Sequence, residues 1–350
     1  MAPEFVPALE LNAGFYADVV EPLVRAWPHS AALLGWGSEI LGLDTERSTD
    51  HGWGPRLQLF VDLDHFWPAR AALDAGLPAE YRGWPVAFGW DEVASTHHVE
   101  VVPLGNWLFN QLGCDPRTAT TYADWLTMPQ QKLLGVTRGA VFHDATGELA
   151  AVRDRLRYFP DELRLWLLAC QWRRLDQEEP FVGRTAEVGD EAGSRVLAAR
   201  LVRDLMRVHF LLAGEYWPYS KWFGSAYRKL PHSAELLPAF EAALVAPDYA
   251  TREDALVAAY EHVARLHNDS GLTEPLDPTV SFFHDRPFRV LGSHRFVEAC
   301  LRAVDDEWLR SLPLVGSIDQ FADSTDVLQN IVSTRTLRAI YGDAIGAGAS

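Results

Sequence analysis

The feature that most constrains this chain is the stretch 35–61, in which a glycine-rich turn leads through acidic residues into an apolar strand. It passes Gly37-Ser38, Asp44 and Asp50 before the strand begins. Glycine lets backbone N–H groups approach a phosphate, and the serine hydroxyl adds a donor. Acidic residues can then hold Mg²⁺, a hard cation that accompanies nucleotide phosphates. The stretch therefore predicts a nucleotide site, and the plainer alternative is a loop that only turns the chain.

This pattern resembles the nucleotidyltransferase superfamily related to DNA polymerase beta, whose members follow Gly-Ser with Asp-x-Asp and a third carboxylate on a later strand. More closely, four segments are similar to the bacterial DUF4037 family, a set of predicted nucleotidyltransferases, and the similarity continues through much of the chain. They are Gly37-Ser38, Gly42-Leu43-Asp44, Ser48-Thr49-Asp50-His51 and Trp53-Gly54-Pro55-Arg56.

The resemblance implies Mg²⁺ and a nucleoside triphosphate, ATP among the candidates, as cofactor and co-substrate. Gly37 and Ser38 would contact the phosphates, and Asp44 and Asp50 would bind the metal and act in catalysis. The sequence departs from the family pattern after Asp50, where His51 and Gly52 leave the second aspartate missing.

Two later segments supply further carboxylates. Residues 56–62 predict a strand that ends in Asp62 and Asp64, whose spacing rivals Asp50 but is more typical of a strand-end turn or helix cap. Residues 97–103 predict another strand, with Glu100 and His98 on one face. Glu100 is our candidate for the third carboxylate, as metal ligand or as acceptor of the attacking hydroxyl's proton, and the alternative is a solvent-facing strand residue.

The remaining pattern predicts an α+β fold. We expect a nucleotidyltransferase-like mixed sheet with flanking helices in residues 1–150, and an all-α helical bundle in residues 151–350 that closes the cleft. Residues 78–89 suggest a loop, residues 130–141 a helix, and residues 142–144 a turn.

Three basic residues of the helical half are candidates for cofactor binding. Arg203 shares a helical face with Arg200 and Arg207, and guanidinium groups grip phosphates well, although a solvated face is an equal alternative. Arg184 lies in a charged segment that could line the cleft, and Lys221 follows Tyr219 in a segment similar to DUF4037. Arg203 and His209 also fit, loosely, the Arg-x4–6-His pattern of HEPN ribonucleases.

Composition limits the classes of partner. The formal net charge of −17 argues against non-specific binding to nucleic acid or to an anionic membrane. Three scattered cysteines exclude a disulfide framework or a cysteine zinc site, and no run of apolar residues is long enough for a membrane span. A cytoplasmic location is expected; the oligomeric state stays open.

From these features we expect a Mg²⁺-dependent nucleotidyltransferase that moves a nucleoside monophosphate from a nucleoside triphosphate to a small-molecule or protein acceptor and releases pyrophosphate. The alternatives are a catalytically degenerate nucleotide-binding or regulatory protein, which the missing aspartate favours, and an antitoxin-like partner module, which the helical half suggests.

Overall fold

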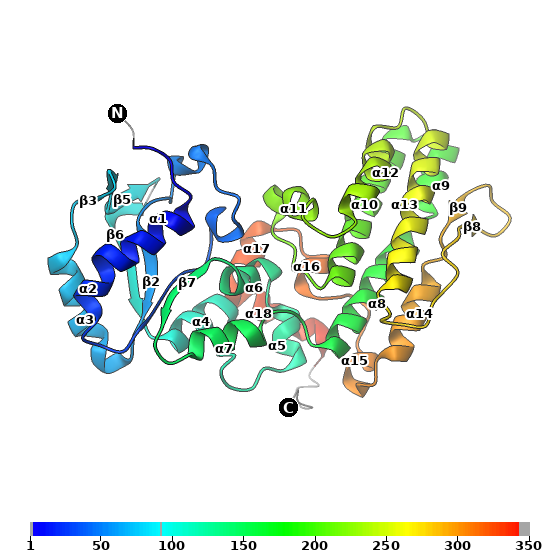
Figure 1. The fold of residues 1–350 in the computed structure, drawn as a ribbon. Coiled ribbons are helices and arrows are strands. Elements are labelled where there is room, and N and C mark those ends of the chain that lie inside the picture. Colours follow the sequence, from blue (N-terminus) through cyan, green and yellow to red (C-terminus); the bar gives the residue numbers. More distant parts are fainter. Residues whose placement is uncertain (1–2, 92, 343–350) are drawn as a thin grey trace.

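A five-stranded mixed sheet organises the N-terminal half of the computed structural model, which describes residues 3–91 and 93–342 (Figure 1). The strands are β1 (Ser30–Leu33), β2 (Arg56–Phe60), β5 (Ala87–Trp90), β6 (Val93–Val102) and β7 (Ala140–Asp144). Their order is β5-β6-β2-β1-β7; β1 is antiparallel to β2 and β7, and β2 is parallel to β6. The expected α+β class is confirmed.

The two faces of the sheet are covered differently. Leu57 and Leu59 point to a core that also contains residues of the first three helices. Those helices are α1 (Ala8–Phe15), α2 (Glu21–Val24) and α3 (Leu63–Gly76), with a π turn at Tyr16–Val20 between α1 and α2. Gln58 and Phe60 point to the other face, where Phe60 joins the larger core.

Four helices cover this second face of the sheet. They are α4 (Leu104–Leu112), α5 (Tyr122–Thr127), α6 (Gln130–Thr137) and α7 (Glu148–Arg155). Trp107 of α4 packs edge-on against Phe60, with ring centroids 5.5 Å apart. The same face of β2 carries Arg56 and Gln58, two buried polar residues described below.

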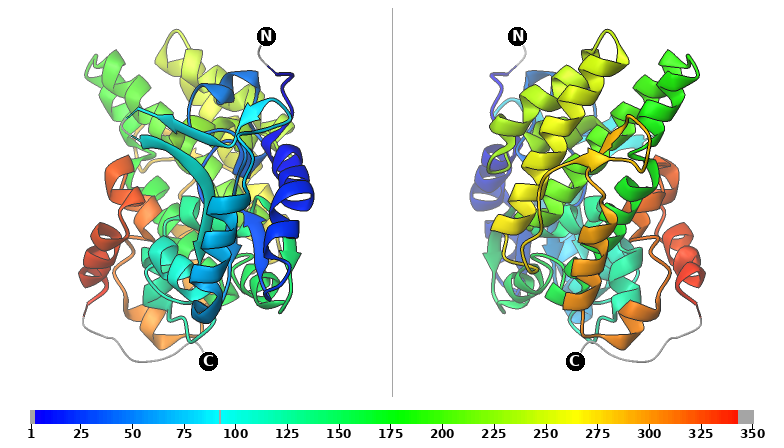
Figure 2. Two further views of the ribbon diagram at one scale, coloured as in Figure 1. Left: turned by 90° about the vertical axis from the view of Figure 1, so that its left-hand side faces the viewer. Right: turned by 90° about the vertical axis from the view of Figure 1, so that its right-hand side faces the viewer.

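The C-terminal half is mostly helical, as expected. Its helices are α8 (Asp161–Glu178), α9 (Phe181–Glu187), α10 (Glu191–Ala213), α11 (Ser220–Tyr227), α12 (Ser233–Val245), α13 (Tyr249–Asp269), α14 (His294–Ala303), α15 (Glu307–Ser311), α16 (Ile318–Phe321), α17 (Thr325–Gln329) and α18 (Ile331–Thr336). A small hairpin of β8 (Ser281–Phe282) and β9 (Arg289–Val290) interrupts them, so the half is not purely α. Figure 2 shows this hairpin beside α13 and α14.

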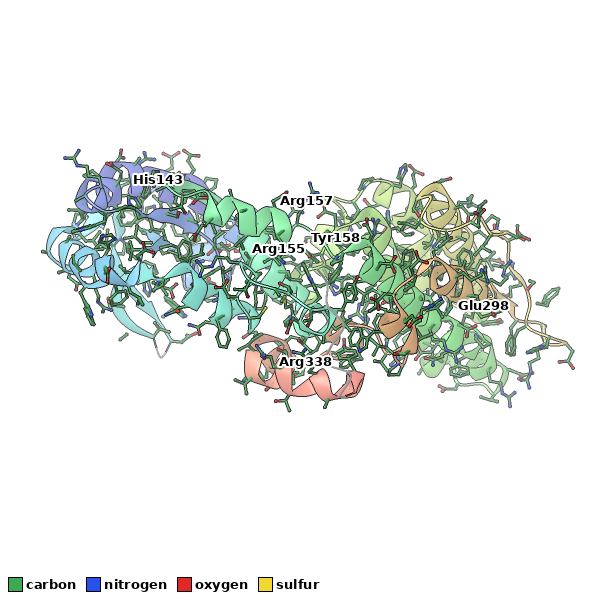
Figure 3. The ribbon with its side chains drawn as sticks, turned by 90° about the horizontal axis from the view of Figure 1, so that it is seen from below. His143, Arg155, Arg157, Tyr158, Glu298 and Arg338 are labelled. Atoms are coloured by element: carbon green, nitrogen blue, oxygen red, sulfur yellow. The ribbon has the colours of Figure 1, made fainter. Side chains whose placement is uncertain are left out.

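One hydrophobic cluster runs through both halves. It contains Phe60 of the sheet and Trp107 of α4, and continues to Trp166 of α8 and Leu205 of α10. Figure 3 shows Tyr158 between the two halves, where α7 leads into α8. The division of the chain near residue 150 stays a prediction.

The last described helices return to the N-terminal half. Arg338 pairs with Asp124 of α5 at 3.0 Å, and the Tyr341 hydroxyl donates to the carbonyl of Gly316 at 2.8 Å.

Within the described residues, every helix is too short or too polar to cross a lipid bilayer.

Two local predictions were wrong. Residues 78–89 are not a plain loop, because they form the hairpin strands β3 (Glu80–Tyr81) and β4 (Trp84–Pro85) and begin β5. Residues 142–144 are not a turn: α6 ends at Thr137, Gly139 adopts φ +71°, and β7 follows. The strand β7 pairs with β1, more than 100 positions earlier, and so distant a partner leaves no local sequence signal.

Candidate functional site

The Gly35–Ser38 turn follows β1 and is fixed on α6. The Gly35 amide donates to the carbonyl of Gly135 at 2.8 Å. A Cβ atom at Gly135 would lie 2.3 Å from the Gly35 carbonyl oxygen, so glycine is required there for the two backbones to meet. The turn is therefore held on α6 by backbone contacts.

A buried ion pair lies inside this turn. The Glu39 carboxylate pairs with Arg56, and both side chains are less than 8% exposed. Arg56 also donates to the Trp36 carbonyl at 2.7 Å. Gly37 has φ +118°, and a Cβ atom there would collide with the Glu39 carboxyl at 2.3 Å. The carboxylate of Glu39 therefore lies against Gly37, where the sequence predicts a contact with phosphate.

Ser38 connects the turn to the segment that carries Asp50. Its hydroxyl lies 3.2 Å from the Ser48 hydroxyl, which in turn accepts the Thr45 amide at 3.0 Å. Ser48 and Asp50 belong to the 3-10 turn Glu46–Asp50. The structure therefore brings Ser38 and the Asp50 segment together.

Asp50 and Asp44 occupy different environments. The Asp50 side chain is 61% exposed and pairs with the neighbouring His51 at 2.8 Å. One oxygen of Asp44 accepts the Ala8 amide at 2.8 Å and the Trp53 indole N–H at 3.2 Å. Asp44 thus anchors α1 to the loop, whereas Asp50 faces solvent.

Trp36 lies beside the position where the family pattern has its second aspartate. Gly52 has φ +64°, and a Cβ atom there would lie 2.6 Å from the Trp36 ring and 3.6 Å from Trp90. The Trp36 residue is 50% exposed, and the Arg56 guanidinium lies 4.7 Å from its ring centroid. An indole therefore takes up the space into which a carboxylate at residue 52 would extend.

Glu100 lies on β6 directly opposite Gln58 of β2. The Gln58 amide reaches the Glu100 carboxylate at 3.4 Å, and its oxygen accepts the Leu34 amide at 2.9 Å. Glu100 is exposed, yet surrounding protein desolvates its carboxyl and raises its pKa, while Gln58 and Arg56 act in the opposite direction. Its predicted position on the same face as His98 is confirmed.

An aromatic cluster borders Glu100 and the turn. Trp36 and Trp90 have ring centroids 5.6 Å apart, Trp90 and His98 5.1 Å, and Phe88 and His98 4.2 Å. Partial burial lowers the pKa of His98, whose Nε2 lies 2.8 Å from the Phe88 carbonyl oxygen. The cluster places the half-exposed indole of Trp36 beside polar groups, and an indole suits stacking of a planar ring.

The donor set does not form a Mg²⁺ site by itself. Asp44 already accepts two N–H groups, and Gly52 has no side chain. In the part of the chain that the structure describes, no three His, Cys, Asp or Glu side chains are grouped so that they could hold a metal ion. Of the three predicted metal ligands, Asp44 anchors α1, whereas Asp50 pairs with His51 and Glu100 contacts Gln58.

The basic candidates of the helical half are separated. Arg184 is exposed on α9, pairs with Glu187, and lies far from the sheet in Figure 1. Lys221 is exposed on α11, with Nζ 5.1 Å from the ring centroid of Trp222. Arg203 on α10 is part of a charged group described below. The structure therefore does not bring Arg184 to the turn.

His209 does not support a ribonuclease site. It is buried, and its Nδ1 lies 2.9 Å from the Tyr227 hydroxyl oxygen. Burial lowers its pKa to about 4. Such a histidine packs in the core rather than serving with Arg203 at a surface.

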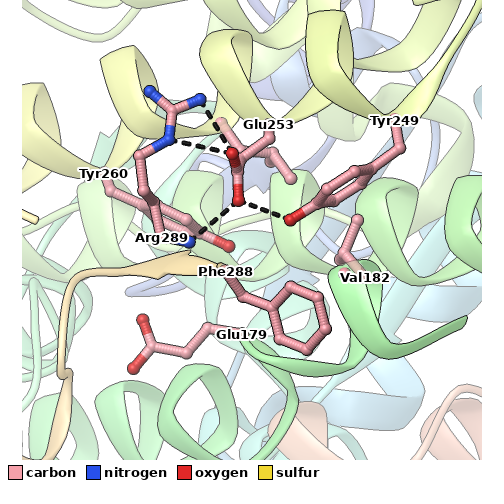
Figure 4. Close-up of a pocket in the computed structure, with 9 residues that line it drawn as sticks. Glu179, Val182, Tyr249, Glu253, Tyr260, Phe288 and Arg289 are labelled. Carbon is pink, nitrogen blue, oxygen red and sulfur yellow. Dashed lines mark hydrogen bonds and ion pairs between the residues drawn. The ribbon is translucent and has the colours of Figure 1, made fainter. Parts of the chain in front are cut away.

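A small pocket lies elsewhere in the helical half (Figure 4). Its polar groups are used internally: Glu253 accepts from Tyr249 and from Arg289, and Glu179 accepts the backbone amides of Leu291 and Ser293 at 2.8 and 2.9 Å. These bonds hold β9 and the start of α14 against α13 and the C-terminal end of α8. The pocket thus reads as a packing feature.

The sequence did not indicate several residues in and around the turn: Trp36, Glu39, Arg56, Gln58 and Trp90. One available signal was Gln58, a polar residue within an apolar strand. The contact of Trp90 with Trp36 depends on the β5–β6 pairing, which no short-range pattern revealed.

Comparison with known proteins gives one family match. A model of the DUF4037 family, described as a domain of unknown function, matches residues 125–223. None of the curated proteins compared matches the chain. A crystal structure of a nucleotidyltransferase-like protein from Exiguobacterium sibiricum 255-15 is similar at 12% identity and a TM-score of 0.33, covering 86% of this chain and 91% of that one. The resemblance to DUF4037 is thus confirmed for residues 125–223, a segment that runs from α5 to α11.

Proposed function

We propose that this protein is a nucleotidyltransferase-like protein that binds a nucleotide beside the Gly35–Ser38 turn. We propose further that this binding does not depend on Mg²⁺. The observation that supports this most is the packing of Trp36 on Gly52. Glycine at position 52 provides no carboxylate for a metal, and the half-exposed indole of Trp36 lies at the same point. Both changes favour binding through the base over binding through a metal.

The surrounding groups fit the rest of a nucleoside. The Trp36 face would stack on the base, an interaction worth about 1–3 kcal/mol. The Gln58 amide and Glu100 carboxyl lie on the neighbouring strands and offer a donor and an acceptor for a base edge or ribose hydroxyl. The Ser38 hydroxyl adds a donor at the turn.

The test is calorimetric titration of the full chain with ATP, GTP, CTP and UTP. Trp36→Ala should weaken binding of the preferred nucleotide about tenfold or more, because the stacking face is lost. Trp67→Ala is the matched control: Trp67 is 72% exposed on α3, away from the turn, so its loss should leave affinity unchanged. Equal affinities for the two variants, or no binding to the wild type, would reject the proposal.

The second candidate is the Mg²⁺-dependent nucleotidyltransferase that the family resemblance implies. Two observations favour it: Asp50 is exposed beside the turn, and the raised pKa of Glu100 suits a proton acceptor. An acceptor hydroxyl of a small molecule or protein would attack the α-phosphate, its proton would pass to Glu100, and pyrophosphate would leave. Mg²⁺ usually needs only one or two carboxylates when phosphates complete its shell.

This candidate predicts pyrophosphate release that requires Mg²⁺ and an acceptor. The measurement is coupled pyrophosphate detection across a panel of hydroxyl-bearing acceptors and with the protein itself as acceptor. Asp50→Ala and Glu100→Gln should each reduce the rate at least 100-fold. Release that is unaffected by both substitutions would exclude these residues as the catalytic pair.

A further inference from the structure

Three arginines of the helical half converge on two aspartates. Arg174 of α8 lies 3.3 Å from the buried carboxylate of Asp204 on α10. Arg207, one turn further along α10, lies 3.6 Å from the same carboxylate. Asp323, between α16 and α17, lies 3.2 Å from Arg203 and 3.6 Å from Arg207. We call Arg174, Arg203, Asp204, Arg207 and Asp323 the arginine cluster.

The guanidinium groups of the cluster are incompletely hydrogen-bonded. The Arg207 side chain is only 8% exposed, yet its Nε and Nη1 have no hydrogen-bond partner among the described residues. The Nε atoms of Arg174 and Arg203 share this condition, as do both carboxylate oxygens of Asp204. Buried polar atoms without hydrogen-bond partners are unfavourable, so these groups keep bonding capacity that a ligand could use.

The balance of charge in the cluster favours an added anion. Three guanidinium groups face the carboxylates of Asp204 and Asp323. Burial, and after it the neighbouring Arg203 and Arg174, lower the pKa of Arg207 to about 10, while Asp204 and Asp323 act in the opposite direction. Arg207 also acts on the buried carboxyl of Asp319, which accepts the Gln130 amide at 3.0 Å and whose pKa burial raises to about 7.

Asp323 is the member of the cluster whose carboxylate an external anion could replace. Its side chain is 65% exposed, and it lies in the short segment between α16 and α17. Both of its oxygens lie near Nη1 of Arg203, at 3.3 and 3.2 Å, so that this one nitrogen is shared between them. A carboxylate carries one charge and two oxygens. A phosphate group carries up to two charges and three free oxygens, and so fits three guanidinium groups better.

We propose that Arg174, Arg203 and Arg207 form a binding site for a phosphate or pyrophosphate group, and that the Asp323 carboxylate takes the place of this group in the free protein. The site shares no residue with the nucleotide site proposed above, so the two stand independently. Its three arginines all lie within residues 125–223, the segment that matches DUF4037. The Gly35–Ser38 turn lies outside that segment.

The test is calorimetric titration of the full chain with inorganic pyrophosphate and, separately, with phosphate and ATP. Arg203→Gln and Arg174→Gln should each weaken pyrophosphate binding about tenfold or more. Arg173→Gln is the matched control, since Arg173 neighbours Arg174 but pairs with Asp176 outside the cluster. It removes the same charge from the same helix and should leave affinity unchanged.

Asp323→Asn gives a result of opposite sign. It removes the competing charge from an exposed segment, so pyrophosphate should bind about threefold to tenfold more tightly. Unchanged or weaker binding in Asp323→Asn, or equal losses in Arg203→Gln and Arg173→Gln, would overturn the inference. ATP binding that is lost in Trp36→Ala while pyrophosphate binding persists would separate the two sites; pyrophosphate binding without ATP binding would reject only the nucleotide site.

Discussion

The turn region of the sheet and the arginine cluster of the helical half differ in how completely their charged side chains are hydrogen-bonded. In the turn, Glu39 and Arg56 form a closed buried pair, and Asp44 accepts two N–H donors. In the cluster, several guanidinium nitrogens and both oxygens of Asp204 have no hydrogen-bond partner in the part of the chain that the structure describes. The charges of the turn region are therefore largely used to build its structure. The unsatisfied charge that a ligand could use lies in the other half.

The strongest test of the closed pair is Arg56→Met. It leaves Glu39 buried without a counter-charge and should lower the free energy of unfolding by about 3–5 kcal/mol, measured by urea denaturation. The control is Arg70→Met, because Arg70 is 53% exposed beside Asp74 and should cost less than about 1 kcal/mol. Adding Glu39→Gln to Arg56→Met should recover part of the loss. A cost for Arg56→Met that matches the Arg70 control would remove the contrast between the two regions.

Asp319, a buried carboxyl that Arg207 of the cluster acts on, predicts a pH effect. Burial raises its pKa from 3.8 to about 7, so the folded protein holds a proton that the unfolded chain releases between these values. The free energy of unfolding contributed by this group therefore falls as pH rises from about 4 to about 7, by at most about 4 kcal/mol, and then stays constant. Urea denaturation at pH 5 and pH 8 should show wild type losing stability relative to Asp319→Asn. A wild type that gains relative to the variant would give the wrong sign.

Restoring the missing aspartate sharpens the turn side of the comparison. Gly52→Asp places a side chain on a left-handed backbone position and against Trp36, and should destabilise the protein by about 1–3 kcal/mol in thermal or urea unfolding. Trp36→Ala in the same chain should relieve the steric part of this cost. If Gly52→Asp is as stable as wild type, Trp36 does not fix the local structure.

Much of the architecture could be predicted because its signals are local. The alternation that placed His98 and Glu100 on one face held, and the helical second half followed from apolar periodicity. The strand β7 was missed because its partner β1 lies more than 100 positions earlier. The hairpin of β3 and β4 is local, but its strands have two residues each and leave too short a pattern to detect.

The roles of individual acids were harder to predict. Nothing in the spacing of Asp44 shows that it accepts the amide of Ala8, 36 positions earlier. The sequence also placed Arg203 and Arg207 on one helical face without showing that Arg174 and Asp323 meet them. Such contacts are set by tertiary packing, and they decide which charges remain available.

The most direct test of the account is the Mg²⁺ dependence of nucleotide binding. ATP, or whichever nucleotide binds best, is titrated into the full chain in EDTA and again in excess Mg²⁺, with wild type and Asp50→Ala. The account predicts dissociation constants that agree within about threefold in all four titrations, since a factor of three is under 1 kcal/mol. Binding that appears only with Mg²⁺ and disappears in Asp50→Ala would contradict it and restore the metal-dependent transferase as the better explanation.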